Sequence, residues 1–381
     1  MLSDTMATSR IAWIDALKAM LIVLVVAGHV FGTAAHYVPS CNMGYYEFMF
    51  KAIYSFHMPA YFFLTGMTLA FRKDQRLGAF VLDKFLGLMV PYFVLNLYAA
   101  PFREWLEVVG EANSQSFPDL LFGIMYSNAD SGYKMASNTL WFIPCLFLAS
   151  VLFFCIKKLC SGDMCMMTTF TAALVFSCWV ANLNHGGGGP SHYRGAIFSV
   201  VFVLAGYLFS QHRVQIDAAV SHYKGIALAA VPALLVIGWR LAVRNGYVSI
   251  IHNEYKSLLL FYASALVTTL ALAIFLMLAA KSKAILKVCK PIDFIGRKTL
   301  PYIAFQVPFM KLMWHYMPGT FGTKAMPWLL LQTVILYFGM MLFAWAVDRY
   351  VPRASGLKAW IGAGRKRLGS GNVQYQEEYR K

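Results

Sequence analysis

Three ionisable side chains lie in the first long apolar stretch of the chain: Asp15, Lys18 and His29. Ionisable groups are costly within an apolar membrane helix, and they mark functional sites by default. Lys18 and His29 are eleven positions apart, about 20° from three full helical turns, so they share one helix face roughly 16 Å apart. Asp15 lies one turn before Lys18, close enough to pair with it. Gly28, next to His29, allows another helix or a ligand to approach closely.

A structural interpretation of these residues is also open. Lys18 alone could extend to the headgroups at a membrane surface, and His29 could hydrogen-bond to a neighbouring helix. The alignment of both residues with Asp15 on one stripe favours a functional role. Histidine can act as a base near neutral pH, which a lysine paired with a carboxylate does not do readily.

The composition indicates which elements must position these residues. The AVILMFWYC set makes up 59% of the 381 residues, charged residues make up 13%, and the mean hydropathy is +0.57. Soluble domains contain about 25% charged residues, so this chain lacks the polar surface of a globule in water. The same numbers exclude a disordered chain, a collagen and a coiled coil. We therefore predict an all-α, polytopic membrane helix bundle.

The cysteines and the net charge exclude several other classes. Seven cysteines are scattered along the chain, and only Cys160 and Cys165 are closely spaced, without a second pair. That pattern predicts neither a zinc site nor a disulfide framework. The outer histidines show no ligand spacing with carboxylates, so no metal is expected. The net charge of +16 is typical of cytoplasmic loops rich in Lys and Arg, and we expect no nucleic-acid partner.

The apolar runs predict about ten transmembrane helices, because a helix needs roughly 20 apolar residues to cross the hydrocarbon core. Most of the 33 Lys and Arg residues fall in alternate loops, which predicts that both termini are cytoplasmic (N-in and C-in). Prolines interrupt the third run at Pro91 and the ninth at Pro301 and Pro308. The runs lie near 11–33, 53–71, 80–101, 138–156, 166–184, 194–211, 224–243, 257–280, 299–317 and 325–348.

We divide the chain into a cytoplasmic N-terminus at 1–10, a membrane domain at 11–350 and a basic cytoplasmic tail at 351–381. The third loop, about 102–137, is long and acidic, and a short interfacial segment is expected near 117–126. The multi-pass pattern predicts a protein of the inner (plasma) membrane, in contact with membrane lipid.

The motif on the first helix resembles a known family. The stretch from Ile14 to Lys18, continued by Gly28 and His29, is similar to the opening motif of acyltransferase family 3. These proteins are integral membrane O-acyltransferases and include sugar acetylases similar to fucose 4-O-acetylase. Their motif has a basic residue, ten intervening residues and a histidine. The resemblance covers roughly residues 8–348.

Three further stretches match the family in the same order. The segment Ser55–Gly66 resembles its "FHMPxFFFxSG" segment, Asn138–Pro144 its "LWFLP" segment, and Gly296–Pro301 its "GRNSLP" element. Two positions depart from the pattern. Gln306 stands where the last element usually has histidine, and Gly87 replaces the second basic residue at the entry to the third span.

The resemblance implies transfer of an acetyl or other short acyl group from acetyl-CoA, or another acyl-CoA, to a carbohydrate hydroxyl. The acceptor would be a surface polysaccharide or a lipid-linked glycan. A sugar hydroxyl is a poor nucleophile and needs a base, a role that we assign to His29. Lys18, nearer the cytoplasm, would serve the catalytic centre and contact the CoA. His57 is the third catalytic candidate: it could orient His29, bind the acceptor or polarise the thioester carbonyl, or simply make a structural hydrogen bond.

Binding residues are predicted at both ends of the bundle. Asn138 and Trp141 lie at the outer end, where an aromatic ring suits sugar stacking, although interfacial belts also use tryptophan. Two basic clusters at the cytoplasmic end could receive the CoA phosphates, although the positive-inside rule alone predicts such clusters. The residues expected to bind the acyl-CoA are Lys18, Arg72, Lys84, Arg297 and Lys298.

A transporter or flippase for a lipid-linked sugar or a small solute is the alternative function. Many spans, prolines within helices and intramembrane charges suit that class as well. A transporter would move its substrate without CoA, whereas a transferase would release CoA and form a stable ester. A purely structural membrane protein would have no need of three aligned ionisable residues.

Overall fold

The computed structural model describes residues 12–37, 43–72, 74–110, 115–127, 135–160, 162–183, 190–282, 299–316 and 326–355. These residues are almost entirely helical, which confirms the predicted fold class. The sheet in the described part of the chain is one antiparallel hairpin, in which Val248 pairs with Tyr255 and Ser249 with Glu254. It joins β1 (Val248–Ser249) to β2 (Glu254–Tyr255).

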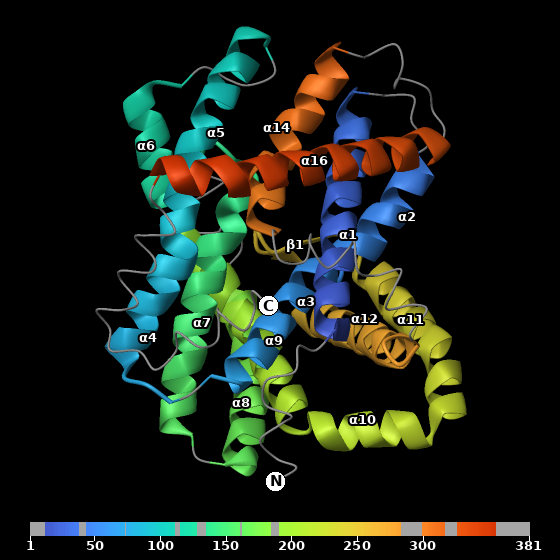
Figure 1. Ribbon diagram of the computed structural model, residues 1–381. Coiled ribbons are helices and arrows are strands. Elements are labelled where there is room, and N and C mark those ends of the chain that lie inside the picture. The colour runs from blue at the N-terminus through green and yellow to red at the C-terminus, as the bar shows by residue number, and fades with distance from the viewer. Residues whose placement is uncertain are drawn as a thin grey trace.

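Figure 1 shows how the helices are arranged. Their bounds are α1 (Ala12–Tyr37), α2 (Met43–Tyr54), α3 (His57–Ala70), α4 (Leu77–Lys84), the π-helix η1 (Phe85–Met89), α5 (Val90–Val108), α6 (Phe117–Tyr126), the 3₁₀-helix η2 (Asn138–Trp141), α7 (Phe142–Leu159), α8 (Asp163–Leu183), the 3₁₀-helix η3 (Pro190–His192), α9 (Tyr193–Gln211), α10 (Arg213–His222), α11 (Lys224–Asn245), α12 (Leu258–Ala279), α14 (Thr299–Tyr316) and α16 (Met326–Ser355).

Seven of the predicted spans coincide with helices of the described residues that are long and apolar enough to cross a membrane. The other three predicted spans also fall on helices, α3, α14 and α16, of which α3 has 14 residues. The seven candidate spans are Trp13–Gly32, Leu77–Val108, Asn138–Leu159, Asp163–Ala181, Pro190–Gln211, Lys224–Asn245 and Leu258–Ala279.

The last helix does not lie alongside the others. Figure 1 shows α16, in red, running across α1 and α14, and both helices contact it. One stripe of α16 is buried, at the spacing of a single helix face. The apolar run at 325–348 therefore forms a helix that covers the bundle. The buried stripe consists of Leu329, Gln332, Thr333, Leu336, Tyr337 and Met340.

The third predicted span contains a local change of helix type. The π-helical turn η1 lies between α4 and α5 and ends just before Pro91. Proline has no backbone N–H, and its ring collides with the carbonyl of residue i−4 in a regular α-helix. A wider turn at Phe85–Met89 avoids that collision, so the helix continues past the proline.

The helix pair α3 and α9 is packed unusually closely at two glycines. A Cβ atom built on Gly66 would lie 1.9 Å from the backbone oxygen of Val203, and one on Gly206 would lie 1.9 Å from that of Phe63. Only glycine permits this approach of two helix backbones. Because α3 begins at His57 and carries Tyr61, the contact also fixes the position of those two side chains.

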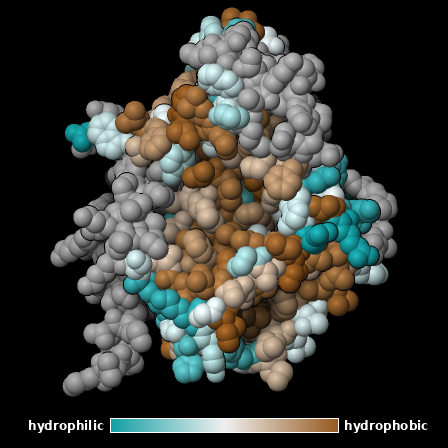
Figure 2. All heavy atoms as spheres, turned by 90° about the vertical axis from the view of Figure 1, so that its right-hand side faces the viewer, coloured by the Kyte–Doolittle hydropathy of each residue, from teal (hydrophilic) through white to brown (hydrophobic). Residues whose placement is uncertain are grey.

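Apolar side chains cover much of the outer surface, as a bundle in lipid requires. The face shown in Figure 2 is largely hydrophobic, with hydrophilic groups gathered toward its lower edge and right side. On α11, Ile226, Leu228 and Val236 are exposed. The expected segment at 117–126 is the helix α6, whose first turn is capped by the hydroxyl of Ser116, which accepts a hydrogen bond from the backbone N–H of Asp119 at 3.3 Å.

Candidate active site

The ionisable face of α1 has the arrangement that its spacing predicts. The Lys18 Nζ lies 3.8 Å from Oδ1 of Asp15, and the two side chains are 24% and 7% exposed. Both residues lie within the candidate span Trp13–Gly32. The carboxylate therefore compensates the lysine charge at a depth where an isolated ammonium group would be costly.

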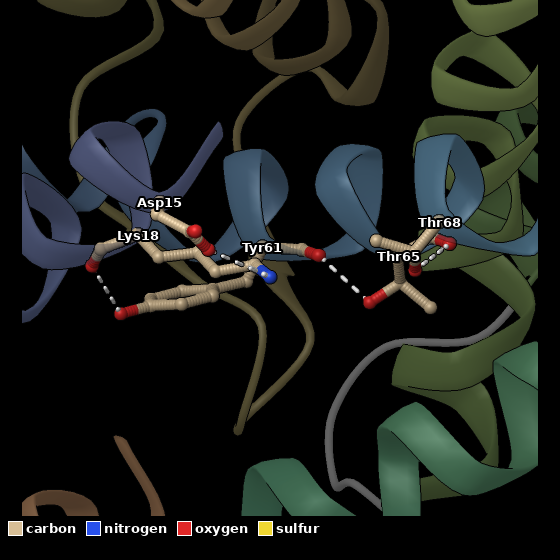
Figure 3. A network of polar contacts seen from close by, with 5 residues as sticks. All are labelled: Asp15, Lys18, Tyr61, Thr65 and Thr68. Carbon is tan, nitrogen blue, oxygen red and sulfur yellow. Dashed lines mark hydrogen bonds and ion pairs between the residues drawn. The ribbon is translucent and has the colours of Figure 1, made fainter. Parts of the chain in front are cut away.

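Tyr61, which the sequence analysis did not single out, makes a hydrogen bond to the turn of α1 that contains Lys18. The Tyr61 hydroxyl donates a hydrogen bond to the backbone oxygen of Lys18 at 3.2 Å. Figure 3 shows it reaching from α3 to α1, while the Lys18 amine points toward Asp15. Thr65 in turn donates to the backbone oxygen of Tyr61 at 2.9 Å. Tyr61 follows His57 by one turn, and this spacing is the signal that could have identified it.

Replacing Tyr61 by phenylalanine tests this contact. The ring remains in place, but the hydrogen bond to the Lys18 oxygen is lost, which costs about 1 kcal/mol of unfolding free energy. Thermal unfolding of the purified protein measures the loss. A Thr68→Val variant is the control, because Thr68 bonds only within its own helix, to the Thr65 oxygen. If the stabilities of Tyr61→Phe and wild type are equal, the contact contributes nothing.

His29 and His57 come together from different helices. Their imidazoles are close enough for their charges to interact, and α1 contacts both α2 and α3. Gly28, next to His29, lies against α2: a Cβ there would lie 3.0 Å from the ring of Tyr54. The Tyr54 ring packs edge-on against the His57 ring at 4.9 Å between centroids. Two histidines that are distant in sequence therefore share one site.

The two imidazoles differ in their hydrogen bonding. His57 is buried, and its Nδ1 lies 2.6 Å from the backbone oxygen of Ile53. A carbonyl only accepts, so Nδ1 carries the hydrogen, and in the neutral ring Nε2 is left as an acceptor. That tautomer suits orienting His29 or accepting from a hydroxyl, and it does not suit polarising a carbonyl. His29 is partly exposed, and no hydrogen bond joins its ring to another described residue.

The segment around Asn138 and Trp141 is fastened to α14. The Ser137 hydroxyl donates to the backbone oxygen of Ala304 at 2.6 Å, and the Thr139 hydroxyl donates to that of Ile303. The Asn138 side chain is exposed and Trp141 is half-buried. The Trp141 ring lies edge-on to the His192 ring, 5.4 Å between centroids. The Asn138 amide and part of the Trp141 indole are therefore accessible to a ligand.

The predicted cytoplasmic cluster is partly neutralised by one acidic side chain, that of Asp83. Arg72 is paired with Asp83 and lies over the ring of Phe80, and the Lys84 Nζ lies 5.7 Å from the centre of the same ring. Arg72 therefore offers a CoA phosphate less free charge than its sequence position suggests. Its Nη1 atom is buried and has no hydrogen-bond partner among the described residues. Arg297 and Lys298, the other pair proposed for the acyl-CoA, lie outside the described residues.

An ion pair lies beside this cluster, on the exposed turn that follows α3. Lys158 donates to a carboxylate oxygen of Asp74. This hydrogen bond and the positive charge of Lys158 lower the pKa of Asp74. The pair therefore persists to a lower pH than it would with an aspartate of ordinary pKa. It joins this segment to the C-terminal end of α7.

Comparison with known proteins assigns the chain to a family. The family described as an acyltransferase domain matches residues 11–349, nearly the whole chain. No curated protein matches the chain significantly. The match spans the ionisable face of α1, the histidine pair and the helices that cover them. This chain thus belongs to acyltransferase family 3, as a multi-pass membrane protein with acyltransferase function.

Proposed function

We propose that this protein transfers an acetyl or other short acyl group from an acyl-CoA to a hydroxyl of a cell-envelope carbohydrate. The observation that carries the proposal is the state of His29. Its imidazole is partly exposed, has no hydrogen bond to another described residue, and lies beside His57 on the helix face that carries Lys18. A general base needs a ring nitrogen that is available to a substrate.

In the proposed acyl transfer, His29 is the general base. The sugar hydroxyl oxygen attacks the thioester carbonyl carbon, and an unprotonated ring nitrogen of His29 takes the hydroxyl proton. The carbon–sulfur bond breaks, and the leaving CoA thiolate takes the proton from His29, which returns to its neutral form. The bond from His57 Nδ1 to the Ile53 oxygen leaves the Nε2 atom of His57 as an acceptor. In this proposal that atom orients His29 during the reaction, when the His29 ring carries a hydrogen on both nitrogens.

The remaining candidate residues bind the two substrates, the acyl-CoA and the carbohydrate. Lys18 contacts the CoA from the inner part of α1, and Asn138 and Trp141 bind the carbohydrate. The basic residues Arg72, Lys84, Arg297 and Lys298 receive the phosphates of the CoA. In this proposal the protein lies in the inner (plasma) membrane in contact with its lipid, and it needs no metal.

The test uses the purified full-length protein in detergent, labelled acetyl-CoA and an extract of cell-envelope glycans. We expect label in a base-labile ester with the wild type and little in Lys18→Ala and His29→Ala. Equal labelling by wild type and both variants would show that neither Lys18 nor His29 takes part in the reaction. Absence of label together with absence of CoA binding would overturn the transferase and favour the transporter or flippase.

The proposed phosphate contacts predict a difference between two donors. Lys84→Ala should raise the KM for acetyl-CoA about tenfold, because a hydrogen bond to a charged phosphate is lost. The same variant should leave the KM for S-acetylpantetheine unchanged, since that donor has no phosphates. Lys224→Ala is the control, as Lys224 is an exposed lysine outside both basic clusters. An equal increase for both donors would contradict a phosphate contact.

A further inference from the structure

Two glutamine side chains in the C-terminal helices are buried without hydrogen bonds. Gln306 on α14 is 1% exposed and Gln332 on α16 is 0% exposed. In both, the amide nitrogen and the amide oxygen lack partners within the part of the chain that the structure describes. A buried polar group that makes no hydrogen bond costs about 1–3 kcal/mol, and buried unsatisfied groups are rare in folded proteins.

Both glutamines lie on helices that cover the candidate active site. The helices α14 and α16 pack against each other, and each also contacts α1, which carries Lys18 and His29. Gln332 belongs to the buried stripe of α16. Gln306 follows Phe305, whose ring contacts the rings of Phe102 on α5 and Phe343 on α16. The two buried amides thus belong to two helices that pack against each other and against α1.

The surroundings of the two amides indicate what kind of ligand would satisfy them. The neighbouring buried positions on these helices, such as Ile303, Leu329 and Leu336, are apolar. A carbohydrate carries a hydroxyl on most of its carbons and would need many polar partners there. A neutral amide offers one acceptor and one NH₂ donor group without charge, which suits a ligand with few, separate amide groups on an otherwise hydrocarbon chain.

We propose that Gln306 and Gln332 bind the pantetheine arm of the acyl donor. This arm has two secondary amides joined by methylene groups, and each amide offers one N–H donor and one C=O acceptor. The inference rests on the proposed function, since it assumes an acyl-CoA donor. Gln306 stands where the family resemblance leads us to expect histidine. An amide does not take up a proton near neutral pH, so Gln306 acts by binding.

The test replaces each glutamine by leucine, an apolar residue of similar volume. The dissociation constant for S-acetylpantetheine should rise about fivefold in Gln306→Leu and in Gln332→Leu, because one neutral hydrogen-bonded group is lost in each. The unfolding temperature without ligand should rise, since an unsatisfied buried amide is removed. A residue with a merely structural role would give the opposite change in stability and no change in binding.

A second donor identifies the amides directly. The thioester S-acetyl-N-acetylcysteamine has only one of the two amides of pantetheine, so wild type should bind it more weakly than S-acetylpantetheine. In the double leucine variant this preference should disappear. Thr333→Val is the matched control on the same buried stripe, because the Thr333 hydroxyl is already satisfied by the Leu329 oxygen at 2.8 Å. It should bind both donors as wild type does.

The possible failures are distinguishable. If wild type transfers acetyl from acetyl-CoA while both leucine variants bind S-acetylpantetheine normally, the glutamine site is wrong and the proposed function stands. If wild type binds neither acetyl-CoA nor S-acetylpantetheine, the proposals of an acyl-CoA donor and of the glutamine site are both wrong.

Discussion

Replacement of His29 by alanine is expected to lower acyl transfer by about 10²–10⁴-fold, the usual contribution of a general base. The imidazole makes no hydrogen bond to another described residue, so its removal should leave the fold intact. The measurement is the initial rate of ester formation with acetyl-CoA, beside the unfolding temperature of the same preparation.

A second substitution at this position separates two roles. His29→Gln keeps a polar side chain that can hydrogen-bond but cannot take a proton near neutral pH, so it should be as inactive as alanine. His222→Ala is the matched control, because His222 is an exposed histidine on α10. It should retain the wild-type rate. Substantial activity in His29→Gln would show that His29 binds substrate and that another group acts as the base.

Replacement of Gly66 by alanine should destabilise the protein by about 3 kcal/mol, at the upper end of the range for overpacked cores. A methyl group there would lie 1.9 Å from the Val203 oxygen. Because that atom belongs to a helix backbone, the collision is relieved only if α3 and α9 move apart. The measurement is thermal unfolding of the purified protein, together with the yield of monodisperse protein.

The close contact of α3 with α9 also predicts how substitutions at its two glycines combine. Gly206→Ala should cost a similar free energy, and the double variant should cost less than the sum, since one separation of the helices relieves both collisions. Gly78→Ala is the control, as a Cβ at Gly78 meets nothing within 4 Å; its stability should stay within about 0.5 kcal/mol of wild type. A Gly66→Ala protein as stable as this control would contradict the packing.

The consequences for activity follow from what α3 carries. Movement of α3 away from α9 would displace His57, at the start of α3, and Tyr61, which holds the Lys18 turn. Any folded Gly66→Ala protein should therefore transfer acyl groups more slowly than wild type. Activity and stability would fall together, whereas His29→Ala should lose activity alone.

The sequence by itself determined the class of protein and the composition of the α1 face. Apolar stretches of about 20 residues specify membrane helices through their own length and composition, whichever neighbours they have. For the same reason, the spacing of Asp15, Lys18 and His29 placed them on one stripe, because helical periodicity is a local property. The ion pair between Asp15 and Lys18 needed no more than this spacing.

The tertiary structure alone decided which side chains meet between helices. Nothing in the sequence around Arg72 shows that Asp83 neutralises it, and the run at 325–348 does not reveal that α16 crosses the bundle. The missing hydrogen bonds of Gln306 and Gln332 likewise depend on what surrounds them. Pairing between helices depends on the complementary shapes of faces that are far apart along the chain, and no single stretch of sequence contains both faces.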